Sequence, residues 1–273
     1  MSLEHQIIAV IGAGNIGRAL IGGLLRGNHL KADQIRATRR NSMALDELQS
    51  SCPGALTGTD NAAAVRDATL VVLAVKPYNV NEVVLQIREH VAPDTLIVSV
   101  AAGLTTSSIC ATFDRPLAVV RTMPNTPMLV DAGATAIALG AHATSDHLAL
   151  VRHMFEAVGE VELVPEHLMD AVTGLSGSGP AYVYTLVEAL TDAGVKQGLP
   201  RPVAFRLSTQ TVLGAAQLIS HTGKHPAILR DEVTTPGGTA IAAIAELEKH
   251  GLRTMFINAV ATATIRSKEL SGD

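Results

Sequence analysis

The stretch Val10-Ile11-Gly12-Ala13-Gly14-Asn15-Ile16-Gly17 decides the fold of this chain. It closes an apolar run and opens a helix-like segment, so the pattern Gly-x-Gly-x-x-Gly lies at a strand-to-helix turn. In this context Gly12 permits a tight turn, Gly14 lets a pyrophosphate approach the backbone, and Gly17 allows close helix packing. The helix N-terminus offers unpaired N–H groups and a partial positive charge to the phosphates. The stretch therefore predicts a dinucleotide site, with an ordinary strand-to-helix turn as the alternative.

Predicted strands and helix-like segments alternate along the first part of the chain. The predicted strands span residues 7–11, 34–38, 68–75, 95–100, 117–121, 134–139 and 161–164. Alternation of this kind is typical of a doubly wound parallel sheet. From Pro165 onward we find only helical segments separated by glycine and proline. The sequence thus predicts an α/β fold with two domains, a Rossmann-type dinucleotide-binding domain over residues 1–164 and an all-helical domain over residues 165–273.

The composition favours a small-molecule partner and an oligomer. Lysine and arginine total 21 against 25 aspartate and glutamate residues, and the basic residues are scattered, which argues against a nucleic-acid surface. Hydrophobic residues make up 47% of the chain and aromatic residues 3%, so the interior is rich in alanine, valine and leucine. Such a chain carries more apolar surface than a small monomer hides, and this predicts oligomerisation.

The cysteine and histidine spacings indicate neither a disulfide framework nor a metal site. Cys52 and Cys110 lie far apart, which favours free thiols in a reducing compartment. His221 and His225 have a metal-like spacing, but no third ligand accompanies them, so we predict no metal. The start of the chain lacks a basic region, and no apolar run reaches membrane-spanning length. We therefore expect a cytoplasmic protein without a membrane segment.

The residues after the second predicted strand choose between the two nicotinamide dinucleotides. In NAD-binding folds an acidic residue about twenty positions past the glycines bonds the ribose 2′-hydroxyl. Here that strand ends in Thr38-Arg39-Arg40, without a carboxylate. Two guanidinium groups suit a 2′-phosphate, so we predict NADPH, with NADH as the alternative. The competing interpretation is that both arginines are solvated surface charges.

Residues beyond the carboxyl ends of the other strands face the same crevice. We expect Lys76 to approach a phosphate or ribose, unless it is a solvated charge, and Asn61 to reach the adenosine side. Asn125 and Thr126, held between two prolines, can orient a nicotinamide carboxamide, with a rigid turn as the equally weighted alternative. The predicted cofactor-binding residues are Gly12, Gly14, Asn15, Ile16, Gly17, Thr38, Arg39, Arg40, Asn61, Ala74, Val75, Lys76, Pro77, Ala101, Ala102, Gly103, Asn125 and Thr126.

Several further segments resemble the pyrroline-5-carboxylate reductase family, which completes proline biosynthesis. They are Gly12–Gly17, Ala74–Pro77, Ala101–Gly103, Asn125–Pro127, Gly174–Tyr182, Asp192–Lys196 and Thr234–Thr239. The resemblance covers nearly the whole chain, and several of these segments do not occur in dehydrogenases generally. It implies an N-terminal Rossmann domain and a helical C-terminal domain that intertwines with its mate in a homodimer, in some members within a ring of dimers.

The same resemblance maps the substrate loop onto Glu232–Ala240, where a helix N-terminus would hold the substrate carboxylate. A Thr-Pro-Gly-Gly turn before a helix presents free amides and little bulk, as a small anion needs, although it is also an ordinary helix start. The family's threonine near the ring nitrogen corresponds to Ala240, so we assign the catalytic hydroxyl to Thr239. The alternatives are that water takes this role or that the reaction does not need it. The predicted substrate-binding residues are Glu232, Val233, Thr234, Thr235, Gly237, Gly238, Thr239 and Ala240.

The implied reaction is hydride transfer from NADPH to 1-pyrroline-5-carboxylate, which gives L-proline. This chemistry asks little of side chains, because a protonated imine is already an electrophile. Two alternatives stay open. A 3-hydroxyacid dehydrogenase needs a general base, and the lysine expected after the glycine-rich helix start is absent behind Gly179. A non-catalytic NADP-binding regulator would use the same fold for sensing.

Overall fold

The computed structural model describes residues 3–271 and divides the chain into two compact units. Unit 1 contains the residues up to Ser178 together with the segment that begins at Thr262, and unit 2 is Gly179–Ala261. The domain boundary predicted at residue 164 stays a prediction. Residues 165–178 group with unit 1, as does the end of the last helix.

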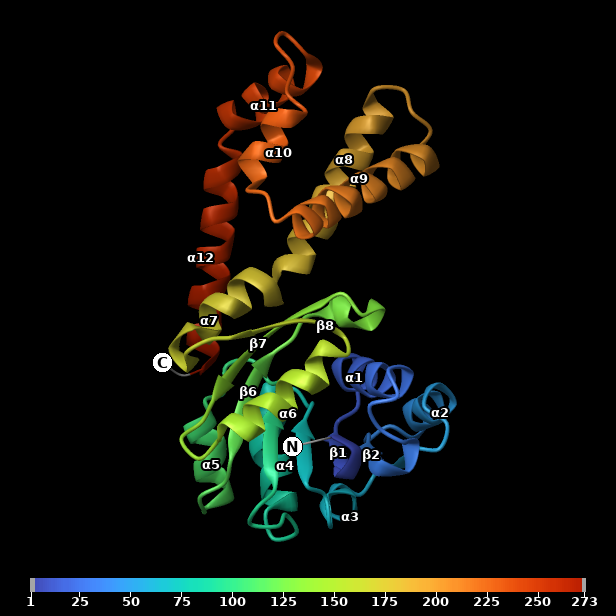
Figure 1. Ribbon diagram of the computed structural model, residues 1–273, viewed down its shortest axis with the longest axis vertical. Helices are drawn as coiled ribbons and strands as arrows, with labels where there is room; N and C mark the ends of the chain where they lie inside the picture. The colour runs from blue at the N-terminus through green and yellow to red at the C-terminus, as the bar shows by residue number, and fades with distance from the viewer. Residues whose placement is uncertain (1–2, 272–273) are drawn as a thin grey trace. The chain divides into compact units, whose positions relative to one another are not determined.

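Unit 1 is built on one eight-stranded sheet with the strand order β3-β2-β1-β4-β5-β6-β7-β8 (Figure 1). Its strands are β1 Ile8–Ile11, β2 Ile35–Thr38, β3 Leu56–Gly58, β4 Leu70–Leu73, β5 Leu96–Ser99, β6 Val119–Met123, β7 Gly133–Leu139 and β8 Gly159–Leu163. The strands from β3 to β6 pair in parallel, which confirms the predicted Rossmann-type sheet.

The strand β7 departs from the parallel pattern. It pairs antiparallel with β6, and β8 then pairs in parallel with β7. Only the short helix η4, Thr126–Val130, lies between β6 and β7. A parallel crossover needs about a dozen residues or more, so this short connection turns the chain back on itself. The apolar run alone did not reveal that direction.

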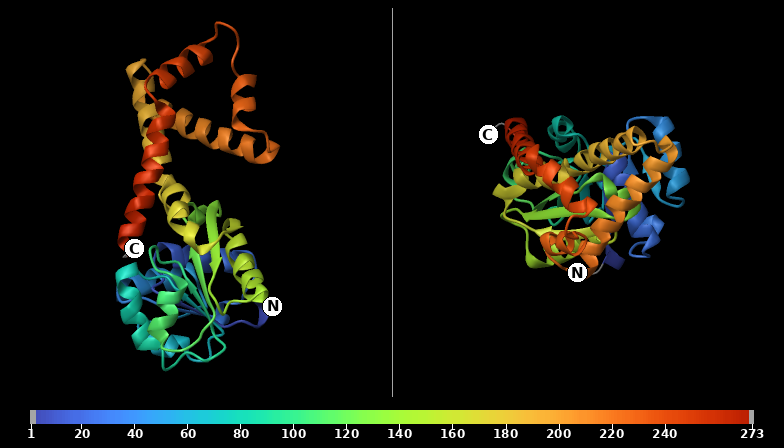
Figure 2. Two further views of the ribbon diagram at one scale, coloured as in Figure 1. Left: turned by 90° about the vertical axis from the view of Figure 1, so that its left-hand side faces the viewer. Right: turned by 90° about the horizontal axis from the view of Figure 1, so that it is seen from above.

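Helices cover both faces of the sheet, as the views in Figure 2 show. The helices of unit 1 are α1 Asn15–Arg26, α2 Ser42–Ser51, α3 Asn61–Val65, α4 Val80–Ile87, α5 Thr106–Phe113, α6 Ser145–Glu156 and α7 Met169–Val172. Alternate residues of each strand enter different clusters. Ile8 and Val10 pack with side chains of α1, α2 and α6, whereas Ala9 and Ile11 pack with those of α3, α4 and α5. The sheet is therefore buried on both faces, which explains its continuous apolar runs.

Two helix starts show how capping decides the boundaries. The Asp60 side chain accepts a hydrogen bond from the Ala63 N–H, so Asp60 is the N-cap of α3. From the sequence we expect Ser145 to cap the helix that follows β7, and this expectation is wrong. The cap is Thr144, whose side chain accepts from the His147 N–H, and Ser145 is the first helical residue of α6.

Unit 2 is helical throughout its described residues, as predicted. Its helices are α8 Gly179–Lys196, α9 Arg201–Thr222, α10 Pro226–Glu232, α11 Thr239–Lys249 and the first half of α12 Leu252–Ser271. Small residues let α8 and α9 approach closely, since a Cβ placed on Gly194 would lie 3.0 Å from the Ala204 Cβ. Many apolar side chains remain exposed, among them Leu186, Phe205, Leu213, Ile241 and Phe256.

Candidate functional site

The glycine turn after β1 has a backbone that only glycine adopts easily. Gly12 has φ +81°, and a Cβ there would lie 2.4 Å from the Val75 Cγ1 atom. The N–H groups of Gly12 and Ala13 both donate to the Thr38 carbonyl, at 3.1 and 2.9 Å, which fixes the turn on β2. A Cβ on Gly14 would meet only the Gly12 carbonyl oxygen, at 3.8 Å. The space in front of Gly14 is therefore open.

The open space faces the N-terminus of α1. Gly14 is the N-cap of α1, and as a glycine it has no side chain that could cap the helix. The first helical hydrogen bond runs from the Arg18 N–H to the Gly14 carbonyl at 2.8 Å. The N–H groups of Asn15, Ile16 and Gly17 accordingly have no partner within the helix. Such a set of donors, together with the helix dipole, attracts a phosphate. Because glycine leaves room for it, the turn fits the predicted pyrophosphate.

A pocket of about 810 Å³ extends from this turn along the carboxyl ends of the parallel strands. It brings together most of the residues predicted to bind a cofactor. These are Gly12, Gly14, Asn15, Ile16, Arg39, Arg40, Asn61, Ala74, Val75, Lys76, Pro77, Ala101, Ala102 and Thr126. Ligands of doubly wound sheets bind at this edge, so the size and place of the pocket suit a dinucleotide.

Three of the predicted cofactor residues lie behind the pocket wall. Thr38 is buried, and its hydroxyl donates to the Asn61 Oδ1 atom at 2.7 Å. A Cβ on Gly17 would lie 3.0 Å from the Val10 Cγ1 atom, so this glycine serves helix packing. Gly103 is buried with φ +75° in the turn after β5. The geometry of these three residues suits a supporting role, in which they hold the residues that line the pocket.

Asn125 lies behind the wall as well, and both ends of its side chain are engaged. It is 9% exposed. Its Oδ1 atom accepts from the Ala134 N–H at 2.9 Å, and its Nδ2 atom donates to the Ser176 carbonyl at 3.0 Å. This arrangement favours the rigid-turn alternative over direct contact with a nicotinamide. The next residue, Thr126, does face the pocket.

The two arginines after β2 are available to an anion. Arg39 is partly exposed and Arg40 is exposed, and both line the pocket. Within residues 3–271 neither takes part in an ion pair. Guanidinium groups without an internal carboxylate partner suit a phosphate monoester.

In unit 2 the predicted substrate loop forms a tight turn before α11. Gly237 has φ +69°, and the Gly238 N–H donates to the Thr235 carbonyl at 2.9 Å. Gly238 is the N-cap of α11 and makes no side-chain capping bond. The N–H groups of the first helical turn, which begins at Thr239, are thus free of helical partners. Thr239 is exposed, whereas Ala240 is partly buried.

Glu232, at the end of α10, has a partner of its own. Its Oε1 atom lies 2.6 Å from the Lys224 Nζ atom. Both side chains are roughly half exposed. Val233 is exposed, and the Thr234 hydroxyl donates to the Arg230 carbonyl at 2.6 Å. The predicted substrate residues therefore lie at the end of α10, in the turn that follows it and at the start of α11.

Comparisons with known proteins agree with this arrangement. The family described as pyrroline-5-carboxylate reductase dimerisation matches residues 166–270, and the family described as NADP oxidoreductase, coenzyme F420-dependent, matches residues 7–103. The pyrroline-5-carboxylate reductase of Methanosarcina acetivorans is 42% identical over 268 residues, which cover 98% of this chain and 99% of that protein. This chain belongs to the pyrroline-5-carboxylate reductase family. The pyrroline-5-carboxylate reductase of Pisum sativum is 41% identical over 270 residues, covering 98% and 97% of the two chains.

Solved structures of the family share the fold. The pyrroline-5-carboxylate reductase from Coxiella burnetii superposes with a TM-score of 0.92 at 38% identity, covering 97% of this chain and 98% of that one. The Plasmodium falciparum pyrroline carboxylate reductase, solved with NADP bound, gives a TM-score of 0.88 at 28% identity, covering 98% and 99%. The chain is accordingly an NAD(P)H-dependent oxidoreductase of proline biosynthesis that reduces pyrroline-5-carboxylate, and it carries the family's dimerisation domain. The full-length identity decides against the two alternative functions.

Several pocket residues of this reductase were missed by sequence reasoning. They are Ile11, Asn41, Thr59, Asn79, Glu82, Val83, Gln86 and Val100. The Asn61 Nδ2 atom donates to the Gln86 Oε1 atom at 2.9 Å, and the Gln86 Nε2 atom donates to the Glu82 Oε1 atom at 3.3 Å. Glu82 and Gln86 lie four residues apart on α4, on the same helix face. That spacing is a signal that could have marked this wall of the pocket.

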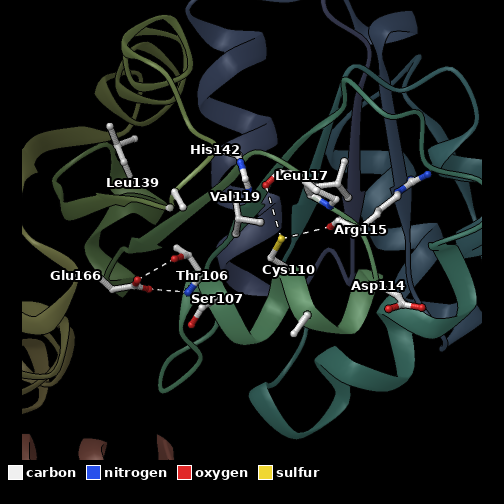
Figure 3. A pocket seen from close by; sticks show the side chains of 14 residues that line it. Thr106, Ser107, Cys110, Asp114, Arg115, Leu117, Val119, Leu139, His142 and Glu166 are labelled. Carbon is white, nitrogen blue, oxygen red and sulfur yellow. Dashed lines mark hydrogen bonds between the residues drawn. The ribbon is translucent and has the colours of Figure 1, made fainter.

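A second pocket of about 660 Å³ lies beside α5 in the reductase (Figure 3). Glu166 occupies one end of it, and the Thr106 N–H and hydroxyl donate to its carboxylate at 2.6 and 2.8 Å. Cys110 is a free, partly exposed thiol whose Sγ atom lies 3.4 Å from the Arg115 carbonyl oxygen. This pocket contains none of the predicted site residues.

The histidines with metal-like spacing are separately engaged. The His221 Nδ1 atom lies 3.1 Å from the Gln217 carbonyl oxygen, and the His225 Nδ1 atom accepts from the Ala227 N–H at 3.2 Å. Within residues 3–271 no group of three or more His, Cys, Asp or Glu side chains has the arrangement of a metal site. In the same part of the chain, no helix combines the length and apolar character that crossing a membrane requires.

Proposed function

We propose that the reductase binds NADPH in preference to NADH, in the pocket of unit 1. The pyrophosphate would accept hydrogen bonds from the amides of Asn15, Ile16 and Gly17, and the 2′-phosphate would bind Arg39 and Arg40. The preference rests on Arg39 and Arg40, which line the pocket and form no ion pair within residues 3–271, and the pyrophosphate site rests on the open face of Gly14 beside these amides. A phosphate that approaches it meets donors and no side chain.

The width of the sheet supports an extended dinucleotide. Arg39 follows β2 and Thr126 follows β6, and β1, β4 and β5 lie between these strands. Four strand spacings of about 4.8 Å place the two ends about 19 Å apart. We therefore assign the adenosine 2′-phosphate to the Arg39 end and the nicotinamide to the Thr126 end.

The cofactor preference is tested by replacing Arg39 and Arg40 with alanine, singly and together. We expect KM for NADPH to rise about tenfold or more for each lost charge-assisted contact, whereas KM for NADH changes little. Lys31→Ala, which removes an exposed lysine outside the pocket, is the control. Equal effects on both cofactors would remove the assignment of the 2′-phosphate to these arginines.

We further propose that the substrate carboxylate binds the free amides at the N-terminus of α11. NAD(P)H supplies a hydride when bound, and this segment would hold the small ring and its charge. Thr239→Pro removes one amide donor at the first helical position, where proline is well tolerated, and Thr239→Val removes only the hydroxyl. The proposal expects Thr239→Pro to weaken binding of the product L-proline more than Thr239→Val does. Equal binding by both variants would contradict it.

Thr239 is also the proposed catalytic residue, because its hydroxyl lies one position before Ala240. If this hydroxyl gives the ring nitrogen its proton, Thr239→Val should lower kcat about 100-fold, the usual effect of a general acid. Ala240→Thr in the Thr239→Val background would then restore part of the rate. A kcat of Thr239→Val equal to that of the unaltered enzyme would assign the proton to water instead.

We propose that the reductase is a homodimer in the cytoplasm, with a ring of dimers as the larger alternative. The exposed apolar side chains of unit 2 support association, since soluble monomers rarely leave so many uncovered. Cys52 and Cys110 form no disulfide within the described residues, which suits a reducing compartment. Light scattering after size exclusion would distinguish a monomer, a dimer and a ring.

A further inference from the structure

The loop between β6 and η4 connects two parts of unit 1 through one side chain. Asn125 accepts from the Ala134 N–H, at the start of β7, and donates to the Ser176 carbonyl. Ser176 belongs to the π-helical segment Thr173–Gly177, which follows α7. The side chain is 9% exposed, so water competes little for these bonds.

The sequence removes one backbone donor that the Ser176 carbonyl could otherwise use. In a regular α-helix this carbonyl would accept from the N–H four residues later, and that residue is Pro180, which has no N–H. The amide of Asn125 donates to it at 3.0 Å instead. A carbonyl near a proline is a frequent site for such a replacement, because a buried acceptor without a donor is costly.

Two further contacts hold the end of β6, directly before this loop. The Thr122 hydroxyl donates to the Ser99 carbonyl at 3.0 Å, at the end of β5. On the other side, a Cβ placed on Gly177 would lie 2.5 Å from the Met123 Cε atom, so the π-helical segment packs directly on the last residue of β6. The residue after Asn125, Thr126, then lines the cofactor pocket. The position of Thr126 is thus set by bonds that lie outside the pocket.

We propose that Asn125 is a positioning residue. Its side-chain amide locks the loop between β6 and η4 onto the π-helical segment, which keeps Thr126 on the pocket wall at the nicotinamide end. The inference rests on the proposed cofactor pocket and goes beyond it, since it assigns no contact with the cofactor to Asn125. The Asn125 side chain acts only through the backbone that it holds.

Binding measurements without turnover test this role. Asn125→Ala removes both bonds, and Asn125→Asp keeps the acceptor for Ala134 but turns a second acceptor toward the Ser176 carbonyl. We expect Kd for NADPH to rise about 2- to 10-fold in Asn125→Ala, the range of one net hydrogen bond, and further in Asn125→Asp. Kd for 2′,5′-ADP should not change in either variant, because this ligand occupies the adenosine and phosphate end of the pocket and does not reach the strand end at Thr126. Asn81→Asp, an exposed asparagine outside the pocket, is the charge control.

Each outcome decides the proposal. A rise for NADPH alone supports it. A lower Tm with unchanged Kd for both ligands would make Asn125 merely structural, and equal rises for both would indicate a general collapse of the pocket. The variant Gly14→Ala separates a failure of the role proposed for Asn125 from a failure of the proposed cofactor pocket. If Gly14→Ala loses NADPH and Asn125→Asp does not, only the role of Asn125 fails. If Gly14→Ala binds normally, the pocket itself is wrong.

A double-mutant cycle of Asn125→Ala and Pro180→Ala tests the link between these two residues. Pro180→Ala returns an N–H that can donate to the Ser176 carbonyl. The effect of Asn125→Ala on the NADPH Kd should therefore be about 2- to 5-fold smaller in the Pro180→Ala background, because the carbonyl regains a donor. Identical effects in both backgrounds would contradict the exchange of donors between these residues.

Discussion

Alanine at each glycine of the phosphate turn should separate folding from cofactor binding. Gly12→Ala forces φ +81° on a residue with a Cβ, which costs about 1–2 kcal/mol. That Cβ would also lie 2.4 Å from the Val75 Cγ1 atom and 3.2 Å from the Ala74 carbonyl. Overpacking of this kind costs about 1–3 kcal/mol. We therefore expect a loss of about 2–5 kcal/mol, out of a typical total of about 5–15 kcal/mol.

Gly14→Ala should behave in the opposite way. Gly14 has φ −77°, which alanine adopts freely, and its nearest neighbour would lie 3.8 Å from the new Cβ. Stability should stay within about 0.5 kcal/mol of the unaltered protein. The methyl group would, however, stand where the pyrophosphate approaches the amides, so the affinity for NADPH should fall by about 100-fold or more.

Gly17→Ala lies between these extremes. Its Cβ would lie 3.0 Å from the Val10 Cγ1 atom and 3.5 Å from the Ala13 and Ala74 side chains. Alanine gains about 1 kcal/mol of helix propensity, which offsets part of an overpacking cost of about 1–3 kcal/mol. Urea unfolding and fluorescence titration with NADPH measure the two quantities for all three variants. Normal NADPH binding by Gly14→Ala, or a stability loss as large as that of Gly12→Ala, would refute the reasoning.

Three further predictions concern other parts of the molecule. Cys110 is partly exposed and Cys52 is buried, so a thiol reagent should label one cysteine quickly in the folded protein and both in denaturant; rapid labelling of both would contradict the burial of Cys52. Asp170→Asn should lower the free energy of unfolding in urea by about 1.5–3 kcal/mol, because the buried Arg121 loses one of its two carboxylate partners, at 3.9 Å. An unchanged unfolding midpoint would show that Glu166 alone is enough to neutralise Arg121. Gly237→Ala should weaken binding of L-proline while NADPH titrations stay unchanged, since φ +69° strains the turn of unit 2 and not the pocket of unit 1.

The sequence predicted the parts of the fold that consecutive residues encode. The strand β1, the turn at Gly12 and the helix α1 were all found within a few residues, because one short stretch carries the apolar run, the glycines and the helix. The missed elements have weaker local patterns. The strand β3 has only three residues, and α5 begins among polar residues that suggest a loop. There Thr105 acts as an N-cap, with its side chain accepting from the Ser108 N–H at 3.1 Å.

The residues of the candidate site were also predictable only where consecutive residues encode their position. Residues directly after a strand could be placed at the crevice from their position alone, as for Lys76 and Ala101. Glu82 and Gln86 were missed because they enter the pocket from the face of α4, and the orientation of that face depends on packing. For Asn125 the neighbouring residues favoured neither alternative. The decision needed the positions of Ser176 and Ala134, which lie 51 and 9 residues away.

The buried arginine of β6 shows why such links escape sequence reasoning. Arg121 is 4% exposed and lies 3.8 Å from a Glu166 carboxylate oxygen and 3.9 Å from one of Asp170. Asp170 also accepts from the Ser267 hydroxyl at 2.7 Å, across 97 residues of sequence, and so joins α7 to α12 within unit 1. A charge in the middle of an apolar strand makes sense only once its partners are known, because an unpaired buried charge would be prohibitive. Backbone motifs that bind ligands are therefore local in this chain, whereas the side chains that hold those motifs in place are brought together by the fold.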